Sequence, residues 1–219
     1  MVAKELLNKA ILPMYSEYSP MEILSWMEEY KVSHLPVIKG KKYIGLLSEA
    51  DIFNIDEPEK PIGKQKVFLK NISAKASQHI YEVIKLMSEQ NISVVPVVDE
   101  KNSYLGMITA STIIEKFASY SAVNQPGGII VLVINKVDYL ASQIVQIVES
   151  NDAKVLSLYL ASEDNSSKIY VTIKVNITDI SRILQTFQRY NYEISASFFD
   201  EDIDDLQERY DSLMNYLSI

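Results

Sequence analysis

Residues 32–52 read V-S-H-L-P-V-I-K-G-K-K-Y-I-G-L-L-S-E-A-D-I, and residues 92–113 repeat the pattern as I-S-V-V-P-V-V-D-E-K-N-S-Y-L-G-M-I-T-A-S-T-I. Pro36 of the first copy corresponds to Pro96 of the second. The offset is 60 residues before the turn and 61 after it, so the copies differ by one turn residue. An internal repeat of this length predicts two copies of one supersecondary unit, packed by pseudo-symmetry with related sites between them.

Each copy is predicted to contain a helix, a two-stranded hairpin and a second helix. Ser19-Pro-Met-Glu22 combines an N-cap serine, a proline at the first helical position and the glutamate of a capping box. Apolar residues at helical spacing predict the buried face of each first helix: Met21, Ile23, Leu24 and Met27, and in the second copy Ile80, Val83, Ile84 and Met87. Apolar runs predict the hairpin strands at 35–38, 43–47, 94–98 and 104–108, and closing helices follow near 49–54 and 110–120.

The second half of the chain has a different pattern. Strands are predicted at 129–134, 154–160, 169–175 and 192–199, with helices at 139–150, whose apolar face includes Leu140, and from Thr178. The order βαββαβ is typical of a ferredoxin-like unit, an antiparallel sheet with two helices on one face. A last helix is predicted from about 202 to 217, because its acidic start suits the N-terminal end of a helix dipole.

These elements predict an α+β chain with six segments. They are a first repeat (1–56), a linker (57–66), a second repeat (67–120), a hinge (121–128), the βαββαβ domain (129–199) and an acidic C-terminal helix (200–219).

Composition excludes several classes of function. The 219 residues carry a net charge of −8, and residues 129–219 account for −7 of it, with 7 Lys/Arg and 14 Asp/Glu. A nucleic-acid partner is therefore not expected, since no basic stripe is available. The longest apolar run, 127–134, is too short to cross a bilayer. Cysteine is absent, and the N-terminus has no apolar signal core, so we expect a cytoplasmic protein that does not bind membranes.

The doubled pattern h-S-x-h-P-V-h, turn, h-h-G-h-h-S/T resembles a tandem pair of CBS domains, and the βαββαβ unit resembles an ACT domain. The domain order, the length and the junction Ala122-Val-Asn-Gln-Pro-Gly resemble the acetoin-utilisation (AcuB-type) regulatory proteins. The resemblance implies that the two CBS repeats form one disc-shaped module and that two modules pair into a homodimer or a higher homo-oligomer.

The resemblance also implies a ligand site. CBS pairs that bind adenosine-containing ligands carry Ser/Thr-x-x-Asp from the last strand into a helix start, and Ser48-Glu-Ala-Asp51 matches this segment. A hydroxyl and helix-start N–H groups attract phosphate, and a carboxylate accepts hydrogen bonds from ribose hydroxyls. By the family pattern, Ile72, Ile92 and Ser93 form the adenine wall.

The second copy departs from this pattern. It reads Thr109-Ala-Ser-Thr112, so a threonine replaces the aspartate. We therefore expect a degenerate second site, which by the family pattern is lined by Val32, Ser33 and His34.

Ser48-x-x-Asp51 has an alternative interpretation as a capping box, which contributes about 1 kcal/mol and needs no ligand. The residues alone leave both interpretations open, and Ser48 can serve both.

The distribution of arginines restricts the ligand. Arg182, Arg189 and Arg209 all lie in the C-terminal half, although guanidinium groups are the preferred partners of phosphate oxygens. Phosphate would depend on lysines such as Lys9 or Lys70. AMP, adenosine or a cationic adenosyl compound such as S-adenosylmethionine is therefore expected rather than ATP, as a regulatory ligand and not as a required cofactor.

No constellation of residues predicts a reaction or a metal site. Phosphate-loop, dinucleotide and Gly-x-Ser-x-Gly motifs are absent, and His34 and His79 have no ligand partner at metal spacing. The loop 135–139 lacks the glycine and proline typical of amino-acid-binding ACT domains, so we expect this domain to pair through its sheet.

Two functions remain open. The first is a non-enzymatic regulatory protein, which senses an adenosine-containing ligand and transmits its binding to an ACT-like oligomerisation domain. The second is a ligand-free CBS/ACT dimerisation scaffold that binds a target protein.

Overall fold

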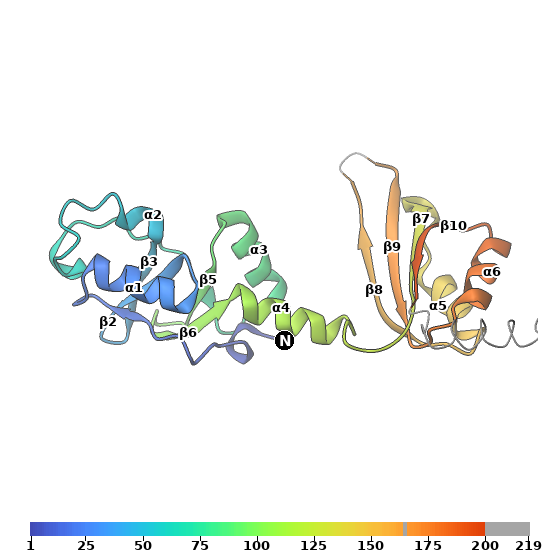
Figure 1. The fold of residues 1–219 in the computed structure, drawn as a ribbon, viewed down its shortest axis with the longest axis horizontal. Helices are drawn as coiled ribbons and strands as arrows, with labels where there is room; N and C mark the ends of the chain where they lie inside the picture. The colour runs from blue at the N-terminus through green and yellow to red at the C-terminus, as the bar shows by residue number, and fades with distance from the viewer. Residues whose placement is uncertain (164–165, 200–219) are drawn as a thin grey trace, which may run out of the picture. The chain divides into compact units, whose positions relative to one another are not determined.

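The computed structural model describes residues 1–163 and 166–199, which fall into two compact units (Figure 1). The first unit comprises Met1–Lys116, and the second begins at Phe117. The predicted acidic helix at 200–219 lies outside the described residues.

The first unit contains the two predicted repeats. The first repeat comprises β1 (Met14–Tyr15), α1 (Pro20–Tyr30), β2 (His34–Lys39), β3 (Lys42–Ser48) and α2 (Glu49–Ile52). The second comprises β4 (Ala74–Lys75), α3 (Ile80–Gln90), β5 (Val94–Val98), β6 (Tyr104–Thr109) and α4 (Ala110–Tyr120). The sheets have the equivalent orders β1-β2-β3 and β4-β5-β6. In both, the first pair of strands is parallel and the second pair is the predicted antiparallel hairpin. Two short 3-10 turns, Ala3–Glu5 and Ile62–Lys64, precede the repeats.

The start of α1 confirms the predicted capping box. The Ser19 hydroxyl oxygen accepts a hydrogen bond from the Glu22 N–H, and the Glu22 carboxylate accepts one from the Ser19 N–H at 2.8 Å. The buried face differs from the prediction, because Met21 is 41% exposed while Ile23 and Met27 are buried. At about 100° per residue, Met21 points away from the side that contains Ile23 and Met27.

The segments that precede the repeats pack on the opposite repeats. Main-chain hydrogen bonds join residues 3–8 to the second repeat: Ala3 to Gln78 (2.8 Å), Lys4 to Ala76 (3.1 Å) and Asn8 to Met107 (2.8 Å). Equivalent bonds join residues 62–70 to the first repeat: Ile62 to Tyr18 (3.0 Å), Gly63 to Ser16 (2.8 Å) and Leu46 to Lys70 (2.8 Å). The two repeats therefore share one hydrophobic core.

Glycine is required where these segments cross the hairpins. A Cβ at Gly45 would lie 2.5 Å from Cβ of Leu69, and a Cβ at Gly106 would lie 3.1 Å from the Leu7 side chain. The repeated glycine of the sequence pattern thus permits the close approach of the exchanged segments.

The second unit has the predicted order of elements. These are β7 (Ile129–Asn135), α5 (Ala141–Glu149), β8 (Val155–Ala161), β9 (Lys168–Val175), α6 (Ser181–Arg189) and β10 (Glu193–Phe198), with a 3-10 turn at Lys136–Asp138. The sheet is antiparallel with the order β10-β7-β9-β8. Both helices cover the same face of the sheet (Figure 1).

Two details of this unit differ from the predictions. Helix α6 begins at Ser181 rather than Thr178. Leu140 was predicted on a buried helix face but is 57% exposed, because it is the N-cap residue and lies outside the helix. Across both units, the helices of the described residues are too short or too polar to span a membrane.

Candidate functional site

The predicted pair Ser48 and Asp51 lies at the start of α2. The Ser48 hydroxyl oxygen accepts a hydrogen bond from the Asp51 N–H at 3.1 Å. Asp51 Oδ2 in turn accepts hydrogen bonds from the N–H (3.2 Å) and the hydroxyl of Ser48. The capping interpretation is therefore confirmed. Within the described residues, Asp51 Oδ1 has no hydrogen-bond partner.

The N–H groups at the start of α2 are largely occupied. The Glu49 N–H donates to the Ser33 carbonyl at 2.9 Å, and the Asp51 N–H donates to Ser48. Ala50 provides the remaining N–H of the first turn. The expected contribution of helix-start N–H groups to phosphate binding is correspondingly small.

Residues predicted for two different sites meet where the repeats join. The Ser93 hydroxyl oxygen accepts a hydrogen bond from the Ser33 N–H at 3.0 Å and contacts His34 Nδ1 at 3.3 Å. The Ser93 N–H donates to His34 Nδ1 at 3.4 Å, so Nδ1 is an acceptor and the neutral ring carries its proton on Nε2. Burial, and secondarily the charge of Lys70, lower the pKa of His34, while Asp51 opposes the shift.

The remaining predicted residues have structural partners. Ile92 is buried in the core, and Ile72 and Val32 pack against it. The Thr109 hydroxyl accepts a hydrogen bond from the Thr112 N–H at 3.2 Å and contacts the Thr112 hydroxyl at 2.9 Å. The second repeat thus has an equivalent cap without a carboxylate.

A hollow of about 400 Å³ lies beside Asp51. Its lining comprises Asp51, Asn54, Ile55, Asp56, Glu57, Gln65, Lys66, Val67 and Phe68. Asp51 is the one predicted ligand residue in this lining. Because composition assigned 57–66 to a linker, the lining of this hollow by Gln65, Lys66, Val67 and Phe68 was not predicted. The sequence feature that could have predicted it is the equivalence of Leu69 with Leu7, which shows that the internal repeat includes the segments before each first helix.

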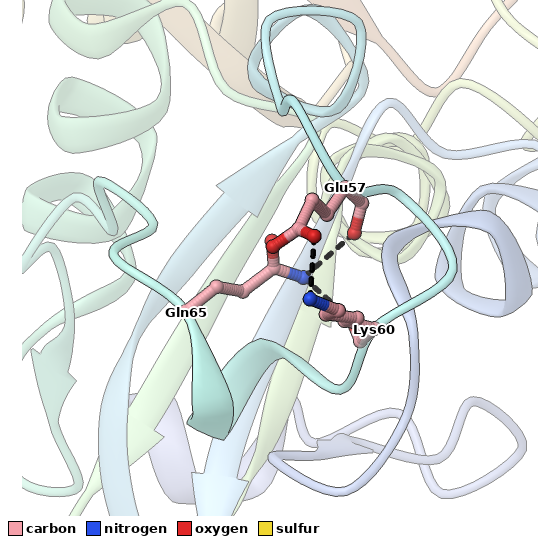
Figure 2. Close-up of polar contacts among 3 residues, drawn as sticks. All are labelled: Glu57, Lys60 and Gln65. Atoms are coloured by element: carbon pink, nitrogen blue, oxygen red, sulfur yellow. Dashed lines mark hydrogen bonds and ion pairs between the residues drawn. The ribbon is translucent and has the colours of Figure 1, made fainter.

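Two of the lining residues, Glu57 and Gln65, belong to a loop that its own polar groups hold together (Figure 2). The Gln65 side-chain amide donates to the main-chain carbonyls of Glu57 and Lys60, and the Lys60 ammonium pairs with the Glu57 carboxylate. These exposed contacts hold residues 57–65 in a closed turn beside the hollow.

The hollow has an acidic lining. Asp51, Asp56 and Glu57 contribute carboxylates, and Lys66 contributes one ammonium. Lys60 neutralises part of the Glu57 charge from the surface. Such a lining favours a neutral or cationic ligand over a polyanion. Within 1–163 and 166–199, the acidic residues and histidines form no cluster of three suited to a metal ion.

The fold is thus a pseudo-symmetric pair of α+β repeats, joined by hydrogen bonds between Ser33, His34 and Ser93. A hollow of about 400 Å³ lies at the start of α2. The CBS domain family matches the sequence twice, at residues 3–57 and 67–119. The chain therefore contains a tandem pair of CBS domains.

Similar proteins share this region. Inosine-5'-monophosphate dehydrogenase from Methanocaldococcus jannaschii is 27% identical over 52% of this chain and 23% of its own length. A CBS domain pair/ACT domain protein from Thermotoga maritima is 19% identical with a TM-score of 0.48, covering 54% of this chain and 98% of that one. A CBS domain pair solved in complex with 5'-methylthioadenosine and S-adenosyl-L-methionine is 27% identical with a TM-score of 0.44, covering 54% of this chain and 97% of that one. The chain thus spans about a quarter of the first curated relative.

Proposed function

We propose that the CBS pair binds an adenosine-containing small molecule beside Asp51 and acts as a non-catalytic regulatory sensor. The supporting observation is the Asp51 carboxylate, which lines the hollow and keeps Oδ1 without a partner in the described residues while Oδ2 completes the cap. A carboxylate oxygen with free lone pairs suits the hydroxyls of a ribose. The volume of about 400 Å³ lies in the range of small-molecule sites, about 300–1,000 Å³.

Phe68 provides a surface for the adenine ring. Its side chain lines the hollow and is 75% exposed. Stacking of a base on an aromatic side chain contributes about 1–3 kcal/mol. Phe68 and Asp51 together offer one partner for the base and one for the ribose.

The acidic lining ranks the ligands within this class. Asp56 and Glu57 repel phosphate groups and attract a sulfonium, and Lys66 is the one cation of the lining. We therefore propose the affinity order S-adenosylmethionine or adenosine, then AMP, then ATP.

Isothermal titration with these four compounds tests the site. Asp51→Asn keeps the size of the side chain and its ability to cap but removes the charge. It is expected to bind adenosine at least tenfold more weakly, a loss of about 1.4 kcal/mol. Thr112→Ala, at the equivalent position of the second repeat, is the matched control and is expected to bind like the wild type. Absence of binding by all four compounds, or equal binding by Asp51→Asn, would contradict the proposal.

We further propose that ligand binding changes the homo-oligomeric state through the second, ACT-like unit. The size of this coupling is limited by the difference in ligand affinity between the two states. Light scattering at several protein concentrations, with and without saturating adenosine, measures the effect. If adenosine binds but leaves the mass distribution unchanged, the CBS pair binds its ligand without transmitting it to the oligomeric state, and this second proposal is contradicted.

Exposed apolar residues on α4 and just after the end of α2 favour a second candidate, a scaffold that binds a second copy or a target protein. Ile114 and Phe117 of α4 are 69% and 53% exposed, and Phe53, equivalent to Ile114, is 72% exposed. Apolar groups gathered on a surface mark protein contacts. If the protein is a scaffold, we expect it to form a concentration-dependent dimer without ligand and to bind no adenosine. Ile114→Asp is then expected to weaken the dimer.

A further inference from the structure

A second hollow, of about 630 Å³, lies beside α6 in the second unit. Its lining comprises Arg182, Gln185, Thr186, Gln188 and Arg189 of α6, together with Asn151 after the end of α5. We call it the arginine hollow.

The guanidinium groups of Arg182 and Arg189 have no carboxylate partner among the described residues. By contrast, Lys154 and Lys168 of the same unit each pair with a glutamate at 2.9 Å. The arginines are seven residues apart, close to two helical turns, so both side chains leave α6 on the same side. This side of the helix therefore carries two guanidinium groups without a carboxylate partner in the described part of the chain.

The buried hydroxyl of Thr186 orients the guanidinium group of Arg189. Thr186 is 5% exposed, and its Oγ1 accepts a hydrogen bond from Arg189 Nη2 at 3.0 Å. The same hydroxyl donates to the Arg182 carbonyl at 2.8 Å and contacts the Asn151 amide at 3.2 Å. Arg189 thus uses one of its five N–H groups to fix its orientation, and no other described residue accepts a hydrogen bond from the remaining four.

Among the residues that the structure describes, the lining of the arginine hollow contains two cations, three amides and a hydroxyl, and no carboxylate. The hollow beside Asp51 contains three carboxylates, and another hollow of this unit contains Asp138 and Glu193 with Lys168. In a chain of net charge −8, the arginine hollow is thus a local concentration of positive charge and hydrogen-bond donors.

We propose that the arginine hollow binds a multiply charged oxyanion of the phosphate or carboxylate class. Guanidinium groups hold such anions through paired N–H donors, and two of them suit a ligand with two oxyanion groups. Two sources could supply this chemistry: a free phosphorylated compound, and the carboxylates that the sequence carries at 200–211. The site is separate from the proposed adenosine site.

Titration of the full chain with pyrophosphate tests the proposal. The wild type is expected to bind, and Arg182→Gln and Arg189→Gln are each expected to bind at least tenfold more weakly. The affinity of Arg189→Lys is expected to lie between those of the wild type and Arg189→Gln, because an ammonium keeps the charge but lacks the paired N–H donors of the guanidinium group. Lys154→Gln removes a cation of the same unit that already has a carboxylate partner, Glu149, and is expected to leave the affinity unchanged. Equal weakening by Lys154→Gln would show a diffuse charge effect and overturn the proposal.

A variant with Asp200→Asn, Glu201→Gln and Asp202→Asn distinguishes the two sources. Pyrophosphate binding that tightens in this variant identifies the chain's own carboxylates as competitors for the arginine hollow. Unchanged binding identifies a free anion as the ligand. Absence of binding in both this variant and the wild type would overturn the proposal. Adenosine contains no phosphate, so failure of the Asp51 site and failure of the arginine hollow are observed separately.

Discussion

The equivalent tyrosines of the two repeats, Tyr43 and Tyr104, have hydroxyls in different surroundings. The Tyr43 hydroxyl donates to the Ile72 carbonyl at 2.6 Å. The Tyr104 hydroxyl is buried and has no hydrogen-bond partner among the residues that the structure describes. Burial raises the pKa of both phenols, so both are neutral throughout the physiological range. The internal repeat therefore supplies a matched pair for measuring one buried hydrogen bond.

Tyr43→Phe removes the hydroxyl and leaves the Ile72 carbonyl without that donor, which costs about 1–2 kcal/mol of unfolding free energy. Tyr104→Phe removes a buried hydroxyl that has no partner, so the expected change is between zero and a gain of about 1 kcal/mol. With an m-value of about 2 kcal/mol/M in urea, a loss of about 1.5 kcal/mol lowers the midpoint by roughly 0.75 M.

Urea unfolding followed by tryptophan fluorescence measures both variants. Trp26 is the one tryptophan of the sequence and lies on α1, where it stacks on Tyr30, so the signal reports the CBS unit. A lower midpoint for Tyr43→Phe with an unchanged or higher one for Tyr104→Phe is expected. Equal losses in the two variants would refute the reasoning, because they would show that ring packing or a common partner dominates.

Three further predictions concern pH dependence, one glycine and one helix cap. Burial lowers the pKa of His34 below 6.5, so the folded protein disfavours the protonated ring. Stability is therefore expected to fall as the pH drops below about 6.5, and less steeply in His34→Val, in urea titrations at several pH values. Gly127→Ala places a Cβ against the Val175 carbonyl oxygen and is expected to destabilise the second unit by roughly 2 kcal/mol or more in denaturation followed by circular dichroism; a neutral result would contradict the fit. Ser19→Ala removes the cap of α1 and should cost about 1 kcal/mol, while Ser25→Ala on the exposed face of that helix should change stability little.

Local patterns predicted most of the secondary structure. The Ser19 capping box, the apolar runs of the hairpins and the alternation of β9 each act through neighbours within a few residues, so they can be identified in the chain itself. The differences arose at the edges of helices. Met21 is exposed because of how α1 is oriented against its sheet, and Leu140 is exposed because α5 begins one residue later, at Ala141.

The candidate site was predictable only in part. Ser48 and Asp51 are three residues apart, and their cap follows from local geometry. The lining by Lys66, Val67 and Phe68 depends on a segment that crosses to the preceding repeat, and composition alone assigned this segment up to Lys66 to a linker. The arginine hollow likewise joins residues of α6 to the end of α5.

The sequence by itself determined the doubled unit, its hairpins and the loss of the aspartate in the second copy, because these are properties of residue type and spacing. The tertiary structure alone decided that Ser93 meets Ser33 and His34, about 60 positions away, and that leading segments are exchanged between the repeats. The physical reason is that such contacts form only when the two repeats bury their apolar faces against each other. The periodic pattern of apolar residues shows which faces are buried but does not fix how the two repeats are oriented against each other.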